Sequence, residues 1–303
     1  MKKPITNPGA SVRARLLELS RSRRIDFQRV LQRYTIERVL YRLGASSNRD
    51  NFVLKGATLF ILWDENLDRP TKDLDFAGYW SSDPTSLGAA FREIFEVPCP
   101  VDGLLFDLES LRLEPIRDQH EYHGFRLSLK ATLDGASIPL QIDVGFGDAV
   151  VPPPALAEFP ILLKGPVPQI KVYSREMAIA EKLHAMVSYG LANSRMKDFF
   201  DIYVLSRRFG FAGETLLKSI TATFSHRNSV LDEELPPALS AKFYVDRSDF
   251  WRGFQRRFRA AEVPSDFSEV GEQVRAFLLP AWQKYVDHAE FSSSWPPGGP
   301  WKG

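Results

Sequence analysis

The N-terminal segment repeats its apolar positions with a helical period. Apolar residues recur at positions 27, 30, 31, 34, 39, 40 and 43, close to the 3.6-residue repeat of an α-helix. Asp26 is a good N-cap for this helix and Gly44 is a typical C-terminal stop. The pattern therefore predicts a helix after Asp26, preceded by a shorter helix from about Val12 to Ser22.

Between residues 51 and 146 the pattern changes to short strands that alternate with helices. Strands are expected at 51–54, 72–79, 104–115, 124–133 and 136–146, and helices at 55–63 and 85–95. Asp134-Gly135 separates the last two strands and is a strong signal for a two-residue hairpin turn. The proline-rich stretch 150–160 is expected to be a connector, because proline cannot donate to a β-ladder.

The second half of the chain has the helical period almost throughout. Ser174 is a good N-cap for a helix that Gly190 would end. Further helices are expected at 194–210, 213–225, 248–260 and 265–286. The elements predict an α+β fold, in which a mixed β-sheet with helices packed on one face is followed by a C-terminal helical bundle. The expected parts are an N-terminal domain with two leading helices, a helical domain and a flexible tail, at 1–165, 166–290 and 291–303.

Composition supports a globular, cytoplasmic protein. The chain has 303 residues, of which 44% are hydrophobic and 25% are charged. No apolar run approaches the roughly 20 residues that cross a bilayer, and the N-terminus lacks the apolar core of a signal peptide. A single cysteine, Cys99, excludes an internal disulfide and a thiolate metal cluster. We therefore expect a reducing compartment and no membrane partner.

The net charge of +1 conceals a basic N-terminal segment. Residues 1–42 contain eleven Lys or Arg against Glu18, Asp26 and Glu37, a balance of +8. Such a segment can attract a polyanion, but charged helix faces are also common as plain solvated surface. Both interpretations are open. A second group of arginines lies among aromatic residues near the C-terminus and could hold an RNA backbone: Arg252, Arg256, Arg257 and Arg259.

The stretch RPTKDLDF, residues 69–76, places two carboxylates where a strand is expected. Aspartate is unusual inside strands. Because side chains alternate between faces, Asp73 and Asp75 share one face while Leu74 and Phe76 occupy the other. Two carboxylates about 4 Å apart repel by about 4 kcal/mol at an effective dielectric of about 20. A hard divalent cation bound between them would remove this repulsion.

A third carboxylate occurs in the same setting. Asp143 and Gln141 lie on the polar side of an amphipathic strand whose apolar side is formed by Ile138, Leu140, Ile142 and Val144. Three carboxylates on one sheet face can hold two metal ions about 3.5 to 4 Å apart. A lone D-x-D pair often occurs by chance, so the third aspartate matters to this interpretation. His120 and His123 have no third ligand that would make a zinc site.

The order of five motifs resembles the AbiEii-type nucleotidyltransferase toxins, members of the DNA polymerase β-like nucleotidyltransferase superfamily. The motifs are FVLKGATLF, RPTKDLDF, QIDVGFGD, AEKLHAM and SRMKDFFDI, and the resemblance covers about residues 30–285. None of the five would be specific alone, whereas the ordered set is. The chain departs from the family at Ala57, where many members have glycine.

The resemblance implies a nucleotidyltransferase-type fold and a set of catalytic residues. Asp73, Asp75 and Asp143 are expected to bind Mg²⁺, with two ions expected. Lys182 is expected to contact the triphosphate of the NTP, and Asp198 to position Lys182 or the nucleotide. From the local sequence alone, Lys182 would be interpreted as a surface lysine.

The resemblance also implies a nucleotide-binding set around the first two motifs. Lys55, Gly56, Arg69 and Thr71 are expected to line the phosphate entrance, together with Lys182. Two further residues, Arg195 and Asp201, are expected either to join the site or only to pair between helices.

The activity implied is metal-dependent transfer of NMP from an NTP to an acceptor, by the toxin of a toxin–antitoxin or abortive-infection system. Known relatives modify the 3′ end of tRNA, so RNA is the expected acceptor and an antitoxin encoded beside the toxin is the expected partner. Three alternatives remain open. The acceptor could be a protein or small-molecule hydroxyl, the chain could be a catalytically silent binding or regulatory module, or the carboxylates could serve a nuclease.

Overall fold

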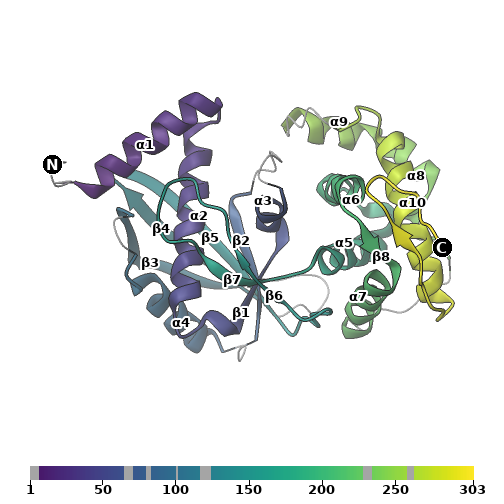
Figure 1. Ribbon diagram of the computed structural model, residues 1–303, viewed down its shortest axis with the longest axis horizontal. Coiled ribbons are helices and arrows are strands. Elements are labelled where there is room, and N and C mark those ends of the chain that lie inside the picture. Colours follow the sequence, from purple (N-terminus) through teal and green to yellow (C-terminus); the bar gives the residue numbers. More distant parts are fainter. Residues whose placement is uncertain are drawn as a thin grey trace. The chain divides into compact units, whose positions relative to one another are not determined.

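The chain folds into two compact units, which are described separately (Figure 1). The computed structural model describes residues 7–64, 71–79, 83–99, 102–116, 124–227, 234–257 and 263–303. Unit 1 comprises Met1–Asp148 and Ala155–Val172, and unit 2 comprises Ala149–Pro154 and Tyr173–Gly303. The predicted boundary after residue 165 therefore falls inside the second segment of unit 1. In the described part of the chain, no helix combines the length and apolarity needed to span a membrane.

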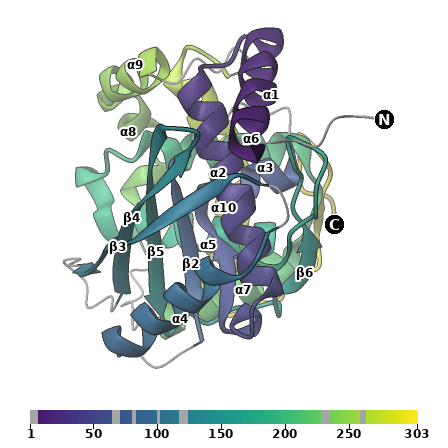
Figure 2. The ribbon, with the colours of Figure 1, turned by 90° about the vertical axis from the view of Figure 1, so that its left-hand side faces the viewer.

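Unit 1 is built on a mixed seven-stranded sheet with the strand order β3-β4-β5-β2-β1-β7-β6. Its strands are β1 (Phe52–Lys55), β2 (Asp73–Gly78), β3 (Leu104–Ile116), β4 (Gly124–Leu133), β5 (Ala136–Phe146), β6 (Ala155–Glu158) and β7 (Gln169–Val172). Its helices are α1 (Pro8–Arg23), α2 (Phe27–Ala45), α3 (Leu59–Trp63) and α4 (Pro84–Glu96). The sheet and its helices confirm the expected α+β class (Figure 2).

One face of the sheet is apolar and the other is polar, as alternation predicts. Leu74 and Phe76 of β2 are fully buried, as are Ile142 and Val144 of β5, and α2 and α4 cover this face. Phe52 contacts both Phe76 and Phe91 of α4 in tilted or edge-on ring geometry. The aspartates of β2 and β5 must therefore lie on the opposite face.

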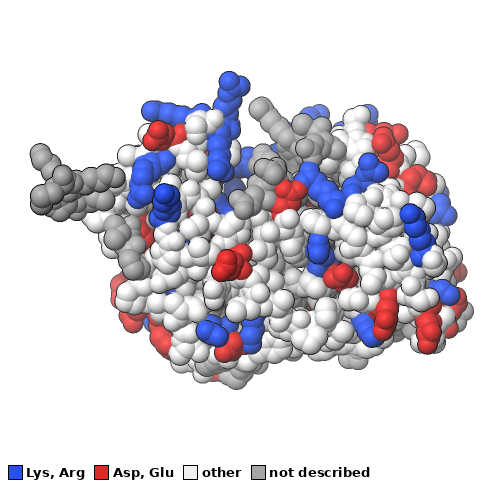
Figure 3. Space-filling model, in the orientation of Figure 1, with Lys and Arg blue, Asp and Glu red and all other residues white. Residues whose placement is uncertain are grey.

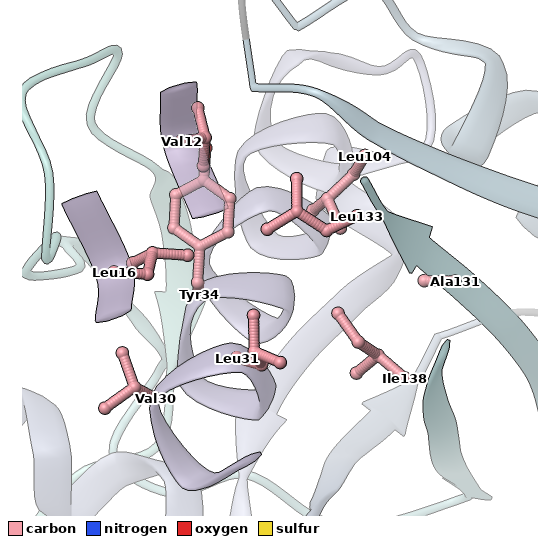
Figure 4. Close-up of a cluster of buried hydrophobic side chains, with 9 residues drawn as sticks. All are labelled: Val12, Leu16, Val30, Leu31, Tyr34, Leu104, Ala131, Leu133 and Ile138. Carbon is pink, nitrogen blue, oxygen red and sulfur yellow. The ribbon is translucent and has the colours of Figure 1, made fainter. Parts of the chain in front are cut away.

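The two N-terminal helices close one end of this core. Val12 and Leu16 of α1 pack with Val30, Leu31 and Tyr34 of α2 onto residues of β3, β4 and β5 (Figure 4). The Tyr34 hydroxyl donates to the carbonyl of Asp102 at 3.1 Å. Asn7 and Asp26 cap the two helices by accepting from Ala10 and Arg29. The leading helices are thus part of the folded core of unit 1.

The basic N-terminal segment is divided between core and surface. Arg42 is buried and donates to Asp102 at 2.6 Å, and Arg33 donates to the fully buried Glu37 at 2.9 Å. Arg38 is also buried. Burial raises the pKa of Glu37, although Arg33 opposes the shift. Neither a polyanion surface nor a solvated face describes these residues, because their side chains pair with Glu37 and Asp102 inside unit 1. The exposed arginines of the segment in the described residues are Arg15, Arg21, Arg23 and Arg24.

The expectation of a plain connector over 150–160 is wrong in its second half. Residues Ala155–Glu158 form β6, which pairs antiparallel with β7 at the edge of the sheet. Proline interrupts a ladder only where its missing N–H is needed, and the prolines at 152–154 precede the strand. An edge strand after a proline run is compatible with this rule.

Unit 2 is the expected helical bundle. Its helices are α5 (Arg175–Tyr189), α6 (Met196–Arg208), α7 (Gly213–His226), α8 (Ala241–Asp246), α9 (Ser248–Arg257) and α10 (Phe267–Val286). Ser174 caps α5 by accepting from the Met177 N–H, and Gly190 follows its last residue with a positive φ of 47°. The core is rich in aromatic rings, including Phe199, Tyr244 and Trp251.

The C-terminal segment is packed, so the expectation of a flexible tail is wrong. Ser294–Trp295 forms β9, which pairs with β8 (Phe211–Ala212), and Trp295 is buried. The indole N–H of Trp295 donates to the Ser206 carbonyl at 2.7 Å, and that of Trp301 donates to the Phe277 carbonyl at 2.9 Å. Proline and glycine signalled disorder, but the tryptophans bury enough surface to order the segment.

Removing one of these anchors should destabilise unit 2. The Trp301 ring stacks on Phe277 with 5.6 Å between the ring centroids, and its centroid lies 4.5 Å from that of Phe291. We expect Trp301→Ala to lower the free energy of unfolding by about 2 kcal/mol, below the full range for a buried tryptophan because Trp301 is half-buried. Thermal and urea unfolding measure this loss. An unchanged midpoint would show that the C-terminal segment does not contribute to the stability of unit 2.

Candidate active site

The polar face of the sheet carries a row of four charged residues on four neighbouring strands. The strand register places Arg126 of β4 opposite Asp143 of β5, Asp143 opposite Asp75 of β2, and Asp75 opposite Lys55 of β1. Paired residues in adjacent strands point to the same face. The order across the sheet is therefore cation, carboxylate, carboxylate, cation. Asp73 lies in the next row, opposite Gln141.

The three predicted carboxylates share an accessible face. Asp73, Asp75 and Asp143 are each half-buried, whereas their sequence neighbours Leu74 and Ile142 are fully buried. The parallel pairing of β2 and β5 is what brings Asp75 and Asp143 together, although the two residues are far apart in the sequence. This arrangement concentrates negative charge at one place on the sheet.

Gly56 makes room for one of these carboxylates. It follows β1 with a positive φ of 72°, and a Cβ built on it would lie 2.1 Å from Asp75 Oδ2. No side chain can occupy that position without moving the carboxylate. The absence of a side chain at Gly56 thus leaves the space that the Asp75 carboxylate occupies.

Lys55 and Thr71 of the nucleotide-binding set have partners within unit 1. The Lys55 ammonium donates to Asp148 Oδ2 at 2.5 Å, and both side chains are largely buried. The Thr71 hydroxyl donates to the carbonyl of Asp73 at 3.1 Å, as does that of Thr58. These bonds fix the start of β2 and the end of β1. Arg69, also expected here, lies outside the described residues, as do His120 and His123.

Arg126 is the site residue that the sequence analysis missed. Its Nε donates to Asp143 Oδ1 at 2.8 Å and its Nη2 donates to Oδ2 at 2.7 Å, so the guanidinium grips both carboxylate oxygens. The hydrogen bond to Asp143 raises the pKa of Arg126, and the charges of Asp143, Asp73 and Asp75 act in the same direction. The Arg126 guanidinium therefore interacts electrostatically with all three carboxylates.

The chemistry of this donor set fits a divalent metal ion. Carboxylate oxygens are the ligands that hard cations prefer, and the positive charge of Arg126 is already stabilised by the three aspartates. Among the described residues, no three Asp, Glu, His or Cys side chains are grouped closely enough to hold an ion as they stand. The Asp143 carboxylate is bound at both oxygens by Arg126.

The helical candidates form an ion-pair network inside unit 2. Lys182 of α5 donates to Asp198 Oδ1 at 3.2 Å and to Asp201 Oδ2 at 2.6 Å, and Arg195 donates to Asp198 Oδ2 at 2.6 Å. Asp198 and Asp201 are 1% and 0% exposed. Two buried carboxylates are thus paired with the largely buried Lys182 and the partly exposed Arg195. Asp201 is as much a part of this network as the predicted Asp198.

Ionisation of Asp198 is maintained against its burial. Burial alone would raise the pKa of this carboxyl, but the charges of Lys182 and Arg195 outweigh it and hold the pKa below its ordinary value. The Lys182 side chain remains 14% exposed. A lysine that is anchored by two carboxylates and still partly accessible is suited to hold its ammonium at a fixed point.

Exposed basic residues gather at one end of unit 1. Arg21 and Arg23 end α1 and Arg24 follows it, and Figure 3 shows Lys and Arg side chains gathered over this part of the molecule. In unit 2, Arg252, Arg256 and Arg257 are exposed on α9, whereas Trp251 of the same helix is fully buried. Arg259 lies outside the described residues. Each unit therefore carries exposed positive charge.

Filling the space beside Asp75 should impair the site. We expect Gly56→Ala to reduce activity by about 10- to 100-fold, because the added methyl displaces the Asp75 carboxylate and the positive φ strains alanine. Gly88→Ala in α4 is the matched control, since a Cβ there meets nothing within 4 Å. Nucleotidyl transfer by the two purified variants compares them. Full activity of Gly56→Ala would mean that the position of Asp75 is not critical.

The fold of the chain is similar to that of solved structures. The chain resembles the crystal structure of a Helicobacter pylori protein provisionally described as a nucleotidyltransferase, with a TM-score of 0.50 and 13% identity. The match covers 88% of this chain and 100% of that one, and at this identity it shows the fold alone. JHP933 from Helicobacter pylori is similar at a TM-score of 0.41 and 14% identity, over 83% of this chain and 90% of that one. No curated protein is similar enough to count as a match.

The family is shown by sequence. Residues 38–287 match the model of the family described as nucleotidyl transferase AbiEii toxin, type IV toxin–antitoxin system, and the chain belongs to this family. The resemblance to the family and the expected enzyme class are confirmed. Family membership implies an NTP substrate, a divalent metal and an antitoxin partner. The match begins at residue 38, so α1 and the first part of α2 lie outside it.

Proposed function

We propose that this nucleotidyltransferase transfers NMP from an NTP to the 3′ end of an RNA, with tRNA as the preferred class, in a reaction that requires Mg²⁺. The observation that carries the proposal is the pairing of Asp75 with Asp143 on the polar face of the sheet, with Asp73 on the same face. Carboxylates in this arrangement suit two metal ions and a triphosphate. The exposed arginines of α1 and α9 support a polyanionic acceptor.

Each residue has a proposed role. Asp73, Asp75 and Asp143 would hold Mg²⁺, which when bound neutralises phosphate charge and lowers the pKa of the attacking hydroxyl. Gly56 keeps the Asp75 carboxylate in place, and Lys55 is fixed beside it by Asp148. The Lys182 ammonium, positioned by Asp198 and Asp201, contributes positive charge to the triphosphate.

A transfer assay tests the acceptor and the metal. The purified chain is incubated with Mg²⁺, each of the four NTPs labelled at the α-phosphate, and total tRNA. We expect label in RNA with at least one NTP and none after EDTA is added. Label on a protein or a small molecule would identify a different acceptor, and RNA cleavage without NTP consumption would indicate a nuclease.

The same question can be asked in cells. Induced expression of the chain should add nucleotides to the 3′ ends of a defined set of RNAs, which sequencing of those ends detects. Expression of the Asp75→Asn variant is the control. Unmodified RNA ends together with arrested growth would overturn the RNA acceptor and leave the enzyme class intact.

A further inference from the structure

Arg126 and a metal ion require the same carboxylate. The guanidinium binds both oxygens of Asp143 at 2.7 and 2.8 Å, so the carboxylate can rotate toward an ion beside Asp75 only by giving up these charge-assisted bonds. The strand register places Asp143 directly between Arg126 and Asp75. Asp143 therefore has one cationic partner on β4 and a second possible cationic site toward β2.

We infer that Arg126 is a positioning residue that competes with a divalent cation for Asp143. The Asp143 carboxylate becomes a metal ligand only when the ion displaces the guanidinium. The inference rests on the metal ligands of the proposed function. The Arg126 side chain is 43% exposed and that of Asp143 is 19% exposed, so the guanidinium has direct access to water when it leaves the carboxylate. A buried arginine would have no such exit.

The competition concerns one ligand of three. Hydrogen bonds join Arg126 to Asp143, whereas its coupling to Asp73 and Asp75 is through charge alone. From Arg126, an ion that uses Asp73 and Asp75 meets charge repulsion alone, whereas an ion toward which Asp143 turns must also displace the two hydrogen bonds. Arg126 should therefore weaken a metal site that includes Asp143 more than one that does not.

Mn²⁺ binding to the full chain without NTP tests this inference. Free Mn²⁺ is measured by its EPR signal during titration of the wild type, Arg126→Gln and Arg126→Lys. We expect Arg126→Gln to bind the Mn²⁺ that uses Asp143 about five- to tenfold more tightly, which is the gain from removing a bidentate competitor. Arg126→Lys keeps the charge but cannot form the bidentate grip, so its affinity should lie between the other two.

Two controls separate competition from a change in the fold. Arg112→Gln alters an exposed arginine of β3 that donates to the carbonyls of Glu109 and Leu111, and it should bind Mn²⁺ like the wild type. Adding Asp143→Asn to Arg126→Gln should abolish the gain. Unchanged or weaker Mn²⁺ binding in Arg126→Gln, or a gain that survives Asp143→Asn, would overturn the inference.

The readout distinguishes this inference from the proposed function. Mn²⁺ titration needs neither acceptor nor turnover, so a failure to modify RNA leaves the competition intact. Conversely, the wild type could transfer NMP to RNA while Arg126→Gln binds Mn²⁺ with unchanged affinity. That result would reject the competition and leave the proposed function intact. Absence of any Mn²⁺ binding by the wild type and both Arg126 variants would reject the metal role and the competition together.

Discussion

Asp75→Asn is expected to reduce nucleotidyl transfer on the order of 10³-fold while leaving the chain folded. The amide keeps the shape of the carboxylate but removes the charge that would bind a metal ion, and loss of one such electrostatic contact typically costs 10² to 10³ in rate. Its neighbours include two carboxylates, Asp143 and Asp73, and two cations, Lys55 and Arg126, so the substitution removes repulsion and attraction together. Thermal stability should therefore change little.

The combination of lost activity with retained stability is the diagnostic result. Transfer from α-labelled NTP and thermal unfolding are measured on the same preparations. Asp107→Asn is the matched control, since it changes an exposed aspartate of β3 in the same sheet. If Asp75→Asn transferred NMP at the rate of the control, the row of charges on the sheet would not be the active site.

Much of unit 1 follows from periodicity in the sequence. Alternation in the strands 72–79 and 136–146 predicts which residues are buried, and the burial of Leu74, Phe76, Ile142 and Val144 confirms it. The shared face of Asp73 and Asp75 follows from the same rule. What alternation cannot predict is the neighbour of each strand. The parallel pairing of β2 with β5 is a property of the whole sheet, and it alone brings Asp75 beside Asp143.

Arg126 could have been found from the sequence, because a signal for it exists. The two-residue turn at Asp134-Gly135 fixes the hairpin register, and counting back from it pairs residue 126 with residue 143. Both turn residues have the positive φ that this turn requires, 47° and 79°. Other features had no such signal. The burial of Arg42 depends on Asp102, which follows in the sequence only after several strands and helices.

The largest effect on stability is expected in unit 2, for Lys182→Met. Lys182 is bonded to two buried carboxylates, and its removal leaves more buried negative than positive charge in the network. Removing one partner of a buried ion pair typically lowers the free energy of unfolding by about 3 to 5 kcal/mol. We expect about 3 kcal/mol for Lys182→Met because the ammonium is partly accessible. Urea unfolding measures the loss. Lys218→Met is the matched control, because this exposed lysine pairs with the exposed Glu214 on α7 and should change the midpoint little.

A double variant separates the structural role of Lys182 from its proposed catalytic one. Adding Asp201→Asn to Lys182→Met removes the excess negative charge, so most of the lost stability should return. Activity should not return, because no ammonium remains for the triphosphate. If the double variant regained both stability and nucleotidyl transfer, Lys182 would be a structural residue only.

The pH dependence of the stability of Lys182→Met tests whether the lost charge causes the loss of stability. In the wild type the pKa of Asp198 lies below its ordinary value, although burial opposes this, so its ionised form contributes stability above the unfolded pKa of about 3.9. That contribution is lost as the pH falls through the folded pKa. In Lys182→Met, Lys182 no longer lowers the pKa of Asp198, so this pKa is higher in the folded variant than in the folded wild type. Acidification therefore reduces the unfolding free energy of the variant less than that of the wild type. The difference in unfolding free energy between the two proteins should therefore shrink between about pH 5 and pH 3. A difference that stays constant over this range would assign the effect of Lys182 to packing instead of charge.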